Sequence, residues 1–284
     1  MAYENFIPTV WAEEINRELE TLCVFAEDCN REYEGSVAKK GDSVRILGVG
    51  KPTITRNNKS AKDTPLADPE TIEDTSSLLY INQLSTFNYK VDDIDKAQSV
   101  GNIMDVLSKE TSEGLACEQD AYIASLAMDK SVERLFKTPL KVVCGAANEG
   151  EVNVLYAIDD ALERLYENNV NYNAKIVITV SPKFKKLFER EYGNLDTNNS
   201  GILEHGHVGM YKNVIVKVSN NVARADGVDH IMIRTQRAIA FVNALTHTEA
   251  YRPEKSFADA VKGFNLFDAK VVRPKEIIDI NVTY

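Results

Sequence analysis

KIVITVSPKFKKLFE, residues 175–189, joins a buried strand directly to a helix. Residues 176–180 are all apolar or β-branched, which is typical of a buried strand. Ser181 suits the helix N-cap and Pro182 suits the first helical position. Phe184, Leu187 and Phe188 then give the helix an apolar face, and Gly193 ends it. A buried strand that leads into a capped helix indicates an α/β layer.

Further strands and one more helix surround this stretch. Strand patterns occur at LKVVCGA (140–146), NVIVKVSNN (213–221), HIMIRT (230–235) and RAIAFVNAL (237–245), and a helical pattern occurs at 152–165. Residues 140–245 are therefore predicted to form one layer with its own core. Residues 246–284 carry the pattern of short β segments.

Residues 93–129 predict one long helix. Asp92 or Asp93 suits its N-cap, and apolar or small residues recur along one side. About 35 residues at 1.5 Å each would span roughly 50 Å. Such a helix needs support from packing, because Gly101 and Gly114 each weaken it by about 1 kcal/mol.

The first 90 residues predict a helix and a projecting hairpin. Residues 9–34 place Trp11, Ile15, Leu19 and later apolar residues at helical spacing, opposite a row of glutamates. Residues 37–50 read as the first arm of a hairpin and residues 78–91 as its second arm. The polar, turn-rich stretch 51–70 between them predicts a projecting loop.

The charge is unevenly distributed. The chain has 33 basic and 43 acidic residues, so its net charge is −10. This argues against a surface built to bind nucleic acid throughout. Residues 1–35 carry nine acids and two bases (−7), residues 36–62 seven bases and one acid (+6), and residues 63–95 eight acids and one base (−7). The basic loop is interpreted as an ordinary solvated surface, as a contact to an acidic surface of another copy, or as a nucleic-acid contact.

The sequence contains none of the common catalytic or nucleotide-binding motifs (GxSxG, HExxH, GxGxxG, P-loop). Glu204, His205 and His207 are the one metal-like cluster, and a solvated loop is the preferred interpretation of it. The cysteines are predicted to be reduced, small buried hydrophobic residues: Cys23, Cys29, Cys117 and Cys144. No apolar run is long enough to span a membrane, and no secretory signal is expected. We therefore predict no catalytic, cofactor or metal site.

The order of these segments resembles the major capsid protein of tailed double-stranded-DNA bacteriophages, whose fold was first described for the Hong Kong phage. The phrases that carry the resemblance are FIPTVWAEEINRELE (6–20), CNREYEG (29–35), VAKKGDSVRI (37–46), FNYKVDDIDKAQS (87–99), IVITVSPKFKKLFE (176–189), GHVGMYKNVIVKVSNNV (206–222) and YRPEKSFADAVKGFNLFDAKVVRP (251–274). The resemblance covers nearly the whole chain, and the order of the phrases is its most specific feature.

The resemblance implies an α+β capsid fold in five segments. These are an N-terminal arm helix (1–35), an extended loop (36–90), a peripheral domain with a spine helix (91–139), an axial domain (140–245) and return strands of the peripheral domain (246–284). The implied function is a non-enzymatic shell subunit that assembles through pentamers and hexamers around phage DNA. The implied partners are other copies of the chain, a scaffolding protein, a portal protein and head-completion proteins. The implied location is the virion, assembled in the host bacterial cytoplasm without a membrane or sequence-specific DNA binding.

Contacts between copies are expected from the charged loop and the arm. The expected interface residues are Lys51, Arg56, Lys59, Lys62, Glu13, Glu14, Glu18 and Trp11, and the expected hinges are Gly35, Gly41, Gly48 and Gly50. Three alternatives stay open. An encapsulin-like nanocompartment would use the same fold, a soluble α/β enzyme would place its site in residues 140–245, and a nucleic-acid-binding protein would use residues 39–62.

Overall fold

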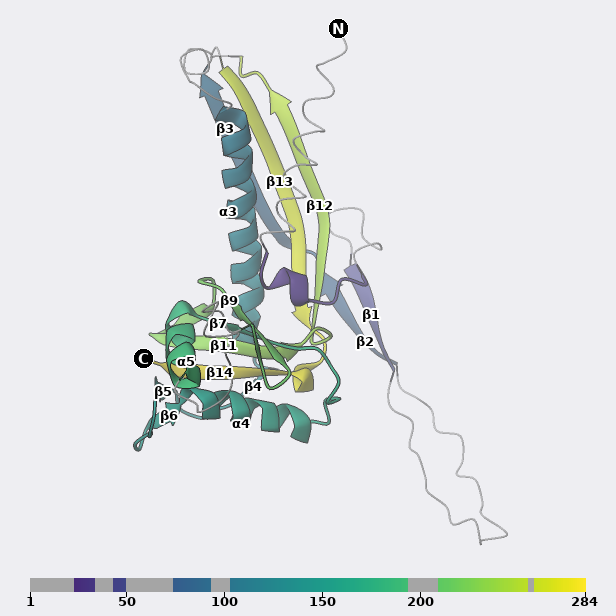
Figure 1. Cartoon of the computed structure of the whole chain (residues 1–284). Coiled ribbons are helices and arrows are strands. Elements are labelled where there is room, and N and C mark those ends of the chain that lie inside the picture. The colour runs from purple at the N-terminus through teal and green to yellow at the C-terminus, as the bar shows by residue number, and fades with distance from the viewer. Residues whose placement is uncertain (1–22, 34–42, 50–73, 93–102, 194–208, 255–257) are drawn as a thin grey trace, which may run out of the picture.

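The computed structural model describes residues 23–33, 43–49, 74–92, 103–193, 209–254 and 258–284. They form an α/β layer, a long helix that lies along an elongated antiparallel sheet, and a separate two-stranded hairpin (Figure 1). The mixed α+β character expected from the sequence is present.

The α/β layer is built on a nine-stranded sheet with the strand order β6-β5-β14-β11-β7-β9-β8. Its strands are β6 (Glu151–Asn153), β5 (Leu140–Val143), β14 (Ile277–Thr283), β11 (Val228–Thr235), β7 (Ile176–Val180), β9 (Val214–Val218) and β8 (Met210–Tyr211), with β10 (Ala223–Ala225) on β11 and β4 (Glu133–Arg134) on β14. Its helices are α4 (Val154–Glu167) and α5 (Pro182–Gly193). The helices touch each other and pack on β14, β6 and β5.

Local sequence explains the helix starts in this layer. The Asn153 side chain accepts a hydrogen bond from the Leu155 amide at 2.8 Å and so caps α4. Ser181 Oγ accepts from the Phe184 amide at 3.4 Å, and Pro182 begins α5 as predicted. All five residues of β7 are buried, as its apolar composition predicts.

The elongated sheet has the order β12-β13-β3 and is antiparallel throughout. Its strands are β12 (Ile239–Tyr251), β13 (Ala258–Val271) and β3 (Gln83–Asp92). Helix α3 (Ile103–Ser125) lies along it and ends in the 3₁₀ turn η3 (Leu126–Met128) (Figure 1). This helix lies within the predicted range 93–129, whose residues 93–102 are outside the described residues.

The hairpin predicted before residue 90 is confirmed in part. Strand β1 (Ser43–Val49) pairs antiparallel with β2 (Asp74–Tyr80), from Ser43 opposite Tyr80 to Val49 opposite Asp74. Ile46 and Leu79 pack with Ile81 on Ala240, Val242 and Leu266, so the hairpin base is attached to the elongated sheet. The second arm ends at Tyr80, because β3 pairs with β13 instead.

The sheet boundaries differ from the predicted grouping in two places. Strand β12 starts in the predicted axial segment but pairs with β13 in the elongated sheet. Strand β14 comes from the predicted return strands but lies between β11 and β5 in the nine-stranded sheet. Six of its seven residues are buried, so its apolar side chains belong to the core of that layer. The five-segment division itself stays a prediction.

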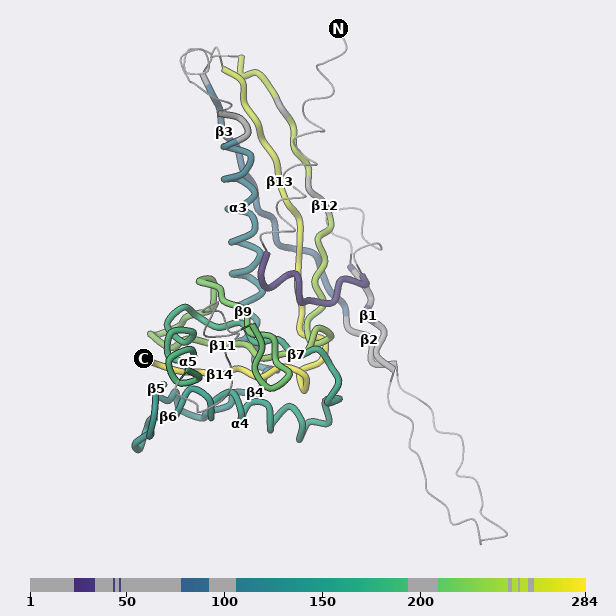
Figure 2. Tube along the Cα trace, in the orientation of Figure 1, coloured from purple at the N-terminus to yellow at the C-terminus, as the bar shows by residue number. Residues whose placement is uncertain are grey.

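The helix predicted over 9–34 does not extend through 23–33. That segment forms one 3₁₀ turn, η1 (Ala26–Asp28), followed by extended backbone at Cys29. A second 3₁₀ turn, η4 (Pro274–Glu276), precedes β14. Figure 2 shows the 23–33 segment in purple as it runs from α3 to β12. Apart from the Cys29 amide, which donates to the Ala26 carbonyl, most of its paired backbone groups hydrogen-bond to other elements.

Candidate assembly interface

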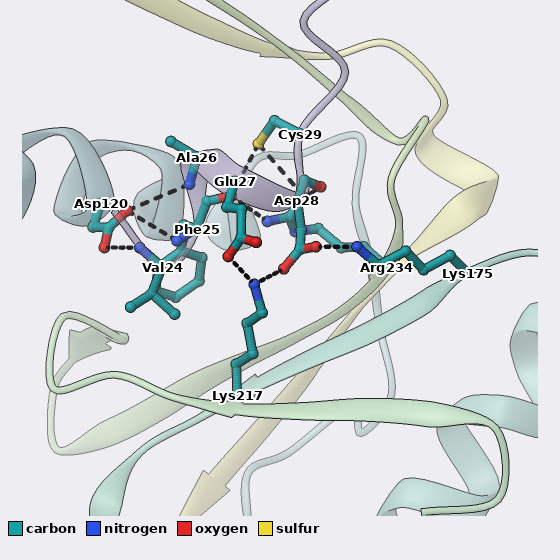
Figure 3. Close-up of polar contacts among 10 residues, drawn as sticks. All are labelled: Val24, Phe25, Ala26, Glu27, Asp28, Cys29, Asp120, Lys175, Lys217 and Arg234. Atoms are coloured by element: carbon teal, nitrogen blue, oxygen red, sulfur yellow. Dashed lines mark hydrogen bonds and ion pairs between the residues drawn. The ribbon is translucent and has the colours of Figure 1, made fainter. Parts of the chain in front are cut away.

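The segment 23–33 is held to α3 by one carboxylate. Asp120, on the buried face of α3, accepts hydrogen bonds from the amides of Val24 at 2.8 Å, Phe25 at 2.9 Å and Ala26 at 3.4 Å (Figure 3). Burial raises the pKa of Asp120, and the three amide donors oppose that rise. A single side chain therefore satisfies three backbone donors that have no helical partner in this segment.

The carbonyl groups of the same segment are satisfied by an arginine. Arg234, in β11, is 1% exposed and donates from Nη2 to the Phe25 carbonyl at 2.8 Å and from Nη1 to the Asp28 carbonyl (Figure 3). Strand β11 belongs to the nine-stranded sheet. The segment is thus fixed between α3 and the α/β layer.

Asp28 is the third anchor and is 1% exposed. Lys175 Nζ lies 2.7 Å from its Oδ1, and Lys217 Nζ lies 2.5 Å from its Oδ2 and from Glu27 Oε2 (Figure 3). Burial acts to raise the pKa of Asp28, but the bonds from both lysines outweigh it and the pKa is lowered. The pKa of Lys217 is raised, because its two carboxylates outweigh the effect of burial.

The segment also joins the elongated sheet. Asn30 bridges to Ala240 of β12, with its amide donating to the Ile239 carbonyl at 2.9 Å and its carbonyl accepting from the Phe241 amide at 3.0 Å. Helix α3, strand β11 and strand β12 therefore converge on eleven residues. We call residues 23–33 with Asp120, Lys175, Lys217 and Arg234 the arm root.

A second anchor holds the corner between β2 and β3. Asp268 of β13 accepts from the Asn82 amide at 3.0 Å and from Tyr122 Oη of α3 at 2.7 Å. Lys270 Nζ donates to the Leu78 carbonyl of β2 at 2.8 Å. The base of the hairpin is therefore fixed to β13 and α3, while its own outer side chains Leu78 and Tyr80 are exposed.

Most predicted interface residues cannot be placed. Lys51, Arg56, Lys59, Lys62, Glu13, Glu14, Glu18, Trp11, Gly35, Gly41 and Gly50 lie outside the described residues. Gly48 lies in β1 opposite Thr75. The interface and hinge roles of these residues remain predictions.

The arm root was not predicted from the sequence. One feature of the sequence indicates it: Arg234 interrupts the apolar strand HIMIRT. A charged residue in a buried strand needs partners. Asp120 gives no such signal, since it lies among other polar residues of a long helix. Its role depends on a backbone segment about 95 residues away.

The cysteine prediction holds for two of the four residues. All four thiols are free. Cys23 and Cys29 are buried, and burial raises the pKa of Cys23 to about 12. Cys117 is exposed on α3, so the prediction is wrong there, and Cys144 is half-buried. Cys117 is exposed because the face of α3 that carries it does not pack on the elongated sheet.

The described ranges show neither a metal-binding cluster nor a membrane-spanning helix. They contain no group of His, Cys, Asp and Glu side chains arranged to hold a metal ion. Glu204, His205 and His207 lie outside those ranges. Among the described helices, none combines the length and apolarity needed to cross a lipid bilayer.

The chain is similar to several solved phage structures. No protein-family model and no curated protein sequence matches it. A chain of Mycobacterium phage Che8 is 28% identical, with a TM-score of 0.70, and the match covers 91% of this chain and 90% of that one. A chain from the capsid of Cyanophage P-SCSP1u is 15% identical, with a TM-score of 0.67 over 92% and 88%. A chain of a virus-like particle from Pyrococcus furiosus is 11% identical, with a TM-score of 0.57 over 99% and 100%.

Each of these similarities covers about nine-tenths or more of this chain. They confirm the capsid fold of tailed bacteriophages and the resemblance to their major capsid proteins. The outlines of the fold therefore follow from the sequence, whereas the arm root is found only in the structure.

Proposed function

We propose that this chain, which has the fold of the major capsid proteins of tailed bacteriophages, is the repeating subunit of such a shell. Copies assemble through pentamers and hexamers into an icosahedral capsid that encloses double-stranded phage DNA. The observation that carries this proposal is the match to a phage chain at 28% identity over nine-tenths of both chains. A similarity of that extent leaves little of the chain for a separate catalytic domain.

The arm root and the hairpin base support the proposal in physical terms. Residues 23–33 directly follow the first part of the predicted arm, and β1 and β2 flank the predicted projecting loop; both are fixed to the rest of the subunit by hydrogen bonds. A rigid starting point limits the directions in which an arm or loop can reach, and this lowers the entropy lost when it docks on a neighbour. Interfaces of permanent assemblies are large, so a lower entropy loss on docking would favour assembly at the contacts of every copy.

The proposed partners follow from the capsid role. Other copies of this chain form the shell, while a scaffolding protein, a portal protein and head-completion proteins direct and finish it. Assembly takes place in the host bacterial cytoplasm and the product is the virion. The chain encloses DNA without sequence-specific binding, and its net charge of −10 gives no general attraction to phosphate either. We propose no enzymatic turnover.

An encapsulin-like nanocompartment is the second candidate. It is favoured by the similarity to the virus-like particle from Pyrococcus furiosus, which covers both chains almost completely but at 11% identity. The contents of the particle distinguish the two. A phage shell is filled with DNA and coexists with portal and terminase genes, whereas a nanocompartment holds a protein cargo encoded nearby.

The test is to express the chain in a bacterium and to examine the purified product by electron microscopy. Icosahedral shells, or pentamers and hexamers, support the capsid role. A monomer or dimer under all assembly conditions, including co-expression with neighbouring phage genes, contradicts it. Cargo protein in the shells, with no portal gene in the neighbourhood, favours the nanocompartment.

A further inference from the structure

Helix α4 presents an exposed face that carries an aromatic and two acidic side chains. Tyr156, Asp160 and Glu163 follow one another at spacings of four and three residues, so they share one face of the helix. All three are exposed, and Tyr156 is 65% exposed. The opposite face of α4 is apolar and buried. We call these three residues the acidic face.

Helix α5 presents an exposed face of the opposite charge. Lys183, Lys186 and Arg190 follow one another at spacings of three and four residues, and all three are exposed. Lys183 Nζ lies 5.6 Å from the ring centroid of Tyr284, a cation–π contact within the chain. We call these three residues the basic face.

Other charges on and around the two helices are already satisfied within the chain. Lys185 pairs with Glu189 at 3.4 Å, and Asp159 pairs with Lys212 at 2.7 Å. Glu191 accepts from the Gly145 amide at 2.8 Å.

By contrast, the two faces keep their charges unpaired. Within the described part of the chain, Lys186, Arg190, Asp160 and Glu163 make no ion pair. The pKa of Asp160 is raised, first by partial burial and then by its acidic neighbours Glu163 and Asp159, which outweigh the opposing charge of Arg164, itself paired with Glu167. A cation placed next to the acidic face would relieve this repulsion.

We propose that the basic face of α5 in one copy lies against the acidic face of α4 in the next copy of a ring. A ring of identical subunits needs two different surfaces that complement each other, because each contact is head-to-tail. Both helices lie in the same α/β layer, at different positions around it (Figure 1). The paired charges set the register, and Tyr156 supplies the kind of large aromatic side chain on which interface affinity usually depends.

This inference rests on the proposed function, and its test separates the two. One variant reverses the basic face (Lys186→Glu with Arg190→Glu), and a second reverses the acidic face (Asp160→Lys with Glu163→Lys). A third carries all four changes. Lys130→Glu with Lys275→Glu is the control for the basic-face reversal, since it changes the net charge by the same amount at exposed positions on neither helix. Far-ultraviolet circular dichroism verifies folding, and gradient sedimentation with electron microscopy measures shells.

Each single reversal places like charges opposite one another, which costs several kcal/mol per contact, so shell yield should fall at least about tenfold. The four-change variant restores opposite charges in swapped positions and should recover most of the yield, as the control should. A mixture of the two single reversals fits together only in alternation, which closes a ring of six but not a ring of five. The mixture should therefore give hexamers and open assemblies but no closed shells.

Two results would overturn the inference. One is a basic-face reversal that assembles like the unchanged chain, and the other is a folded four-change variant that assembles no better than the single reversals. Either result leaves the capsid role intact if the unchanged chain forms shells. If the unchanged chain forms no pentamers, hexamers or shells, the proposed function itself fails.

Discussion

Helices α3 and α4 both bury one face, but the chemistry of the two faces differs. The buried residues of α4 are all apolar: Val154, Leu155, Ala157, Ile158, Ala161, Leu162 and Leu165. The buried residues of α3 include Ser108, Ser112, Gln119 and Asp120 beside apolar ones. Helix α4 is held by hydrophobic burial against its own sheet, whereas α3 also holds a distant chain segment through directed hydrogen bonds. The burial of a helix face therefore does not show whether the face packs on a sheet or binds a distant chain segment.

Removing the carboxylate of α3 should have the largest effect. In Asp120→Ala, two buried amides and one partly buried amide lose their acceptor, and the buried Arg234 loses the attraction of a nearby opposite charge. We expect the free energy of unfolding to fall by about 3–5 kcal/mol. Urea denaturation of unassembled subunits measures it, and hydrogen exchange should show lost protection at residues 24–26.

Two controls sharpen this result. Glu118→Ala changes an exposed neighbour on the same helix and should alter stability by no more than about 0.5 kcal/mol. Asp120→Asn keeps one acceptor oxygen and should lie between the alanine variant and the unchanged chain. An alanine variant within 1 kcal/mol of the unchanged chain would show that water replaces the carboxylate at this site.

A cavity in the face of α4 should cost slightly less. Leu165 is fully buried, and Leu165→Ala should reduce the free energy of unfolding by about 3 kcal/mol through lost burial and an unfilled cavity. Exchange protection at residues 24–26 should fall less than in Asp120→Ala, because the hydrogen bonds of these amides go to Asp120 and remain intact. Glu163→Ala on the exposed face is the control. A loss of protection at residues 24–26 as large as in Asp120→Ala would contradict the distinction between the two helices.

This contrast explains what the sequence predicts and what it does not. The α4 face is visible as a periodic row of apolar residues, and β7 is visible as an apolar run with a helix cap after it. The arm root is not visible in that way, because apolar spacing in residues 23–33 is compatible with a helix. Asp120 and Arg234 take up the backbone groups that the helix would have paired. Tertiary partners therefore override local periodicity there.

The sheet that each C-terminal strand joins cannot be predicted from the sequence for a related reason. Strands β12, β13 and β14 all read as β segments, and nothing in their composition tells which sheet each one joins. The pairing of β14 with β11 depends on residues about 50 positions earlier in the chain. The residues of a segment indicate whether it forms a strand, but they do not indicate which strands lie beside it in the sheet.

Two glycines, Gly263 in the elongated sheet and Gly114 in α3, provide a further comparison. A Cβ on Gly263 would lie 2.6 Å from the His247 carbonyl oxygen and closer still to the Phe87 ring, which packs over this position. We expect Gly263→Ala to lower the free energy of unfolding by about 1–3 kcal/mol through this overlap. Gly114→Ala on the exposed face of α3 is the matched control. Its Cβ would meet nothing within 4 Å, so it should raise stability by about 0.4–1 kcal/mol.

Thermal or urea unfolding of the two variants decides this point. Opposite signs are expected, because the same substitution meets a crowded cross-strand site in one case and open space in the other. A neutral or stabilising Gly263→Ala would mean that Phe87 and the β12 backbone shift without cost. It would also mean that β3 is less tightly registered on β13 than the pairing indicates.

The smallest expected effect is the pH dependence of the arm root. Since the pKa of Asp28 is lowered in the folded chain, its ionised form is favoured by folding. Its contribution is fully present above the ordinary aspartate pKa of about 3.9 and is lost as the pH falls through the lowered folded value. Protonation of the Asp28 carboxylate removes the charge that both lysines contact, and so breaks the two ion pairs.

Asp28→Asn isolates this effect from the other acids of the chain. The stability difference between the unchanged chain and this variant should be constant from pH 7 to about pH 5 and should shrink towards zero below about pH 4. Urea denaturation across that range measures it, and exchange at residues 24–30 locates it. A difference that does not change with pH would mean that the lysines fail to distinguish carboxylate from amide. The arm root would then be held by Asp120 and Arg234, which act on the backbone of residues 24–28 rather than on the Asp28 side chain.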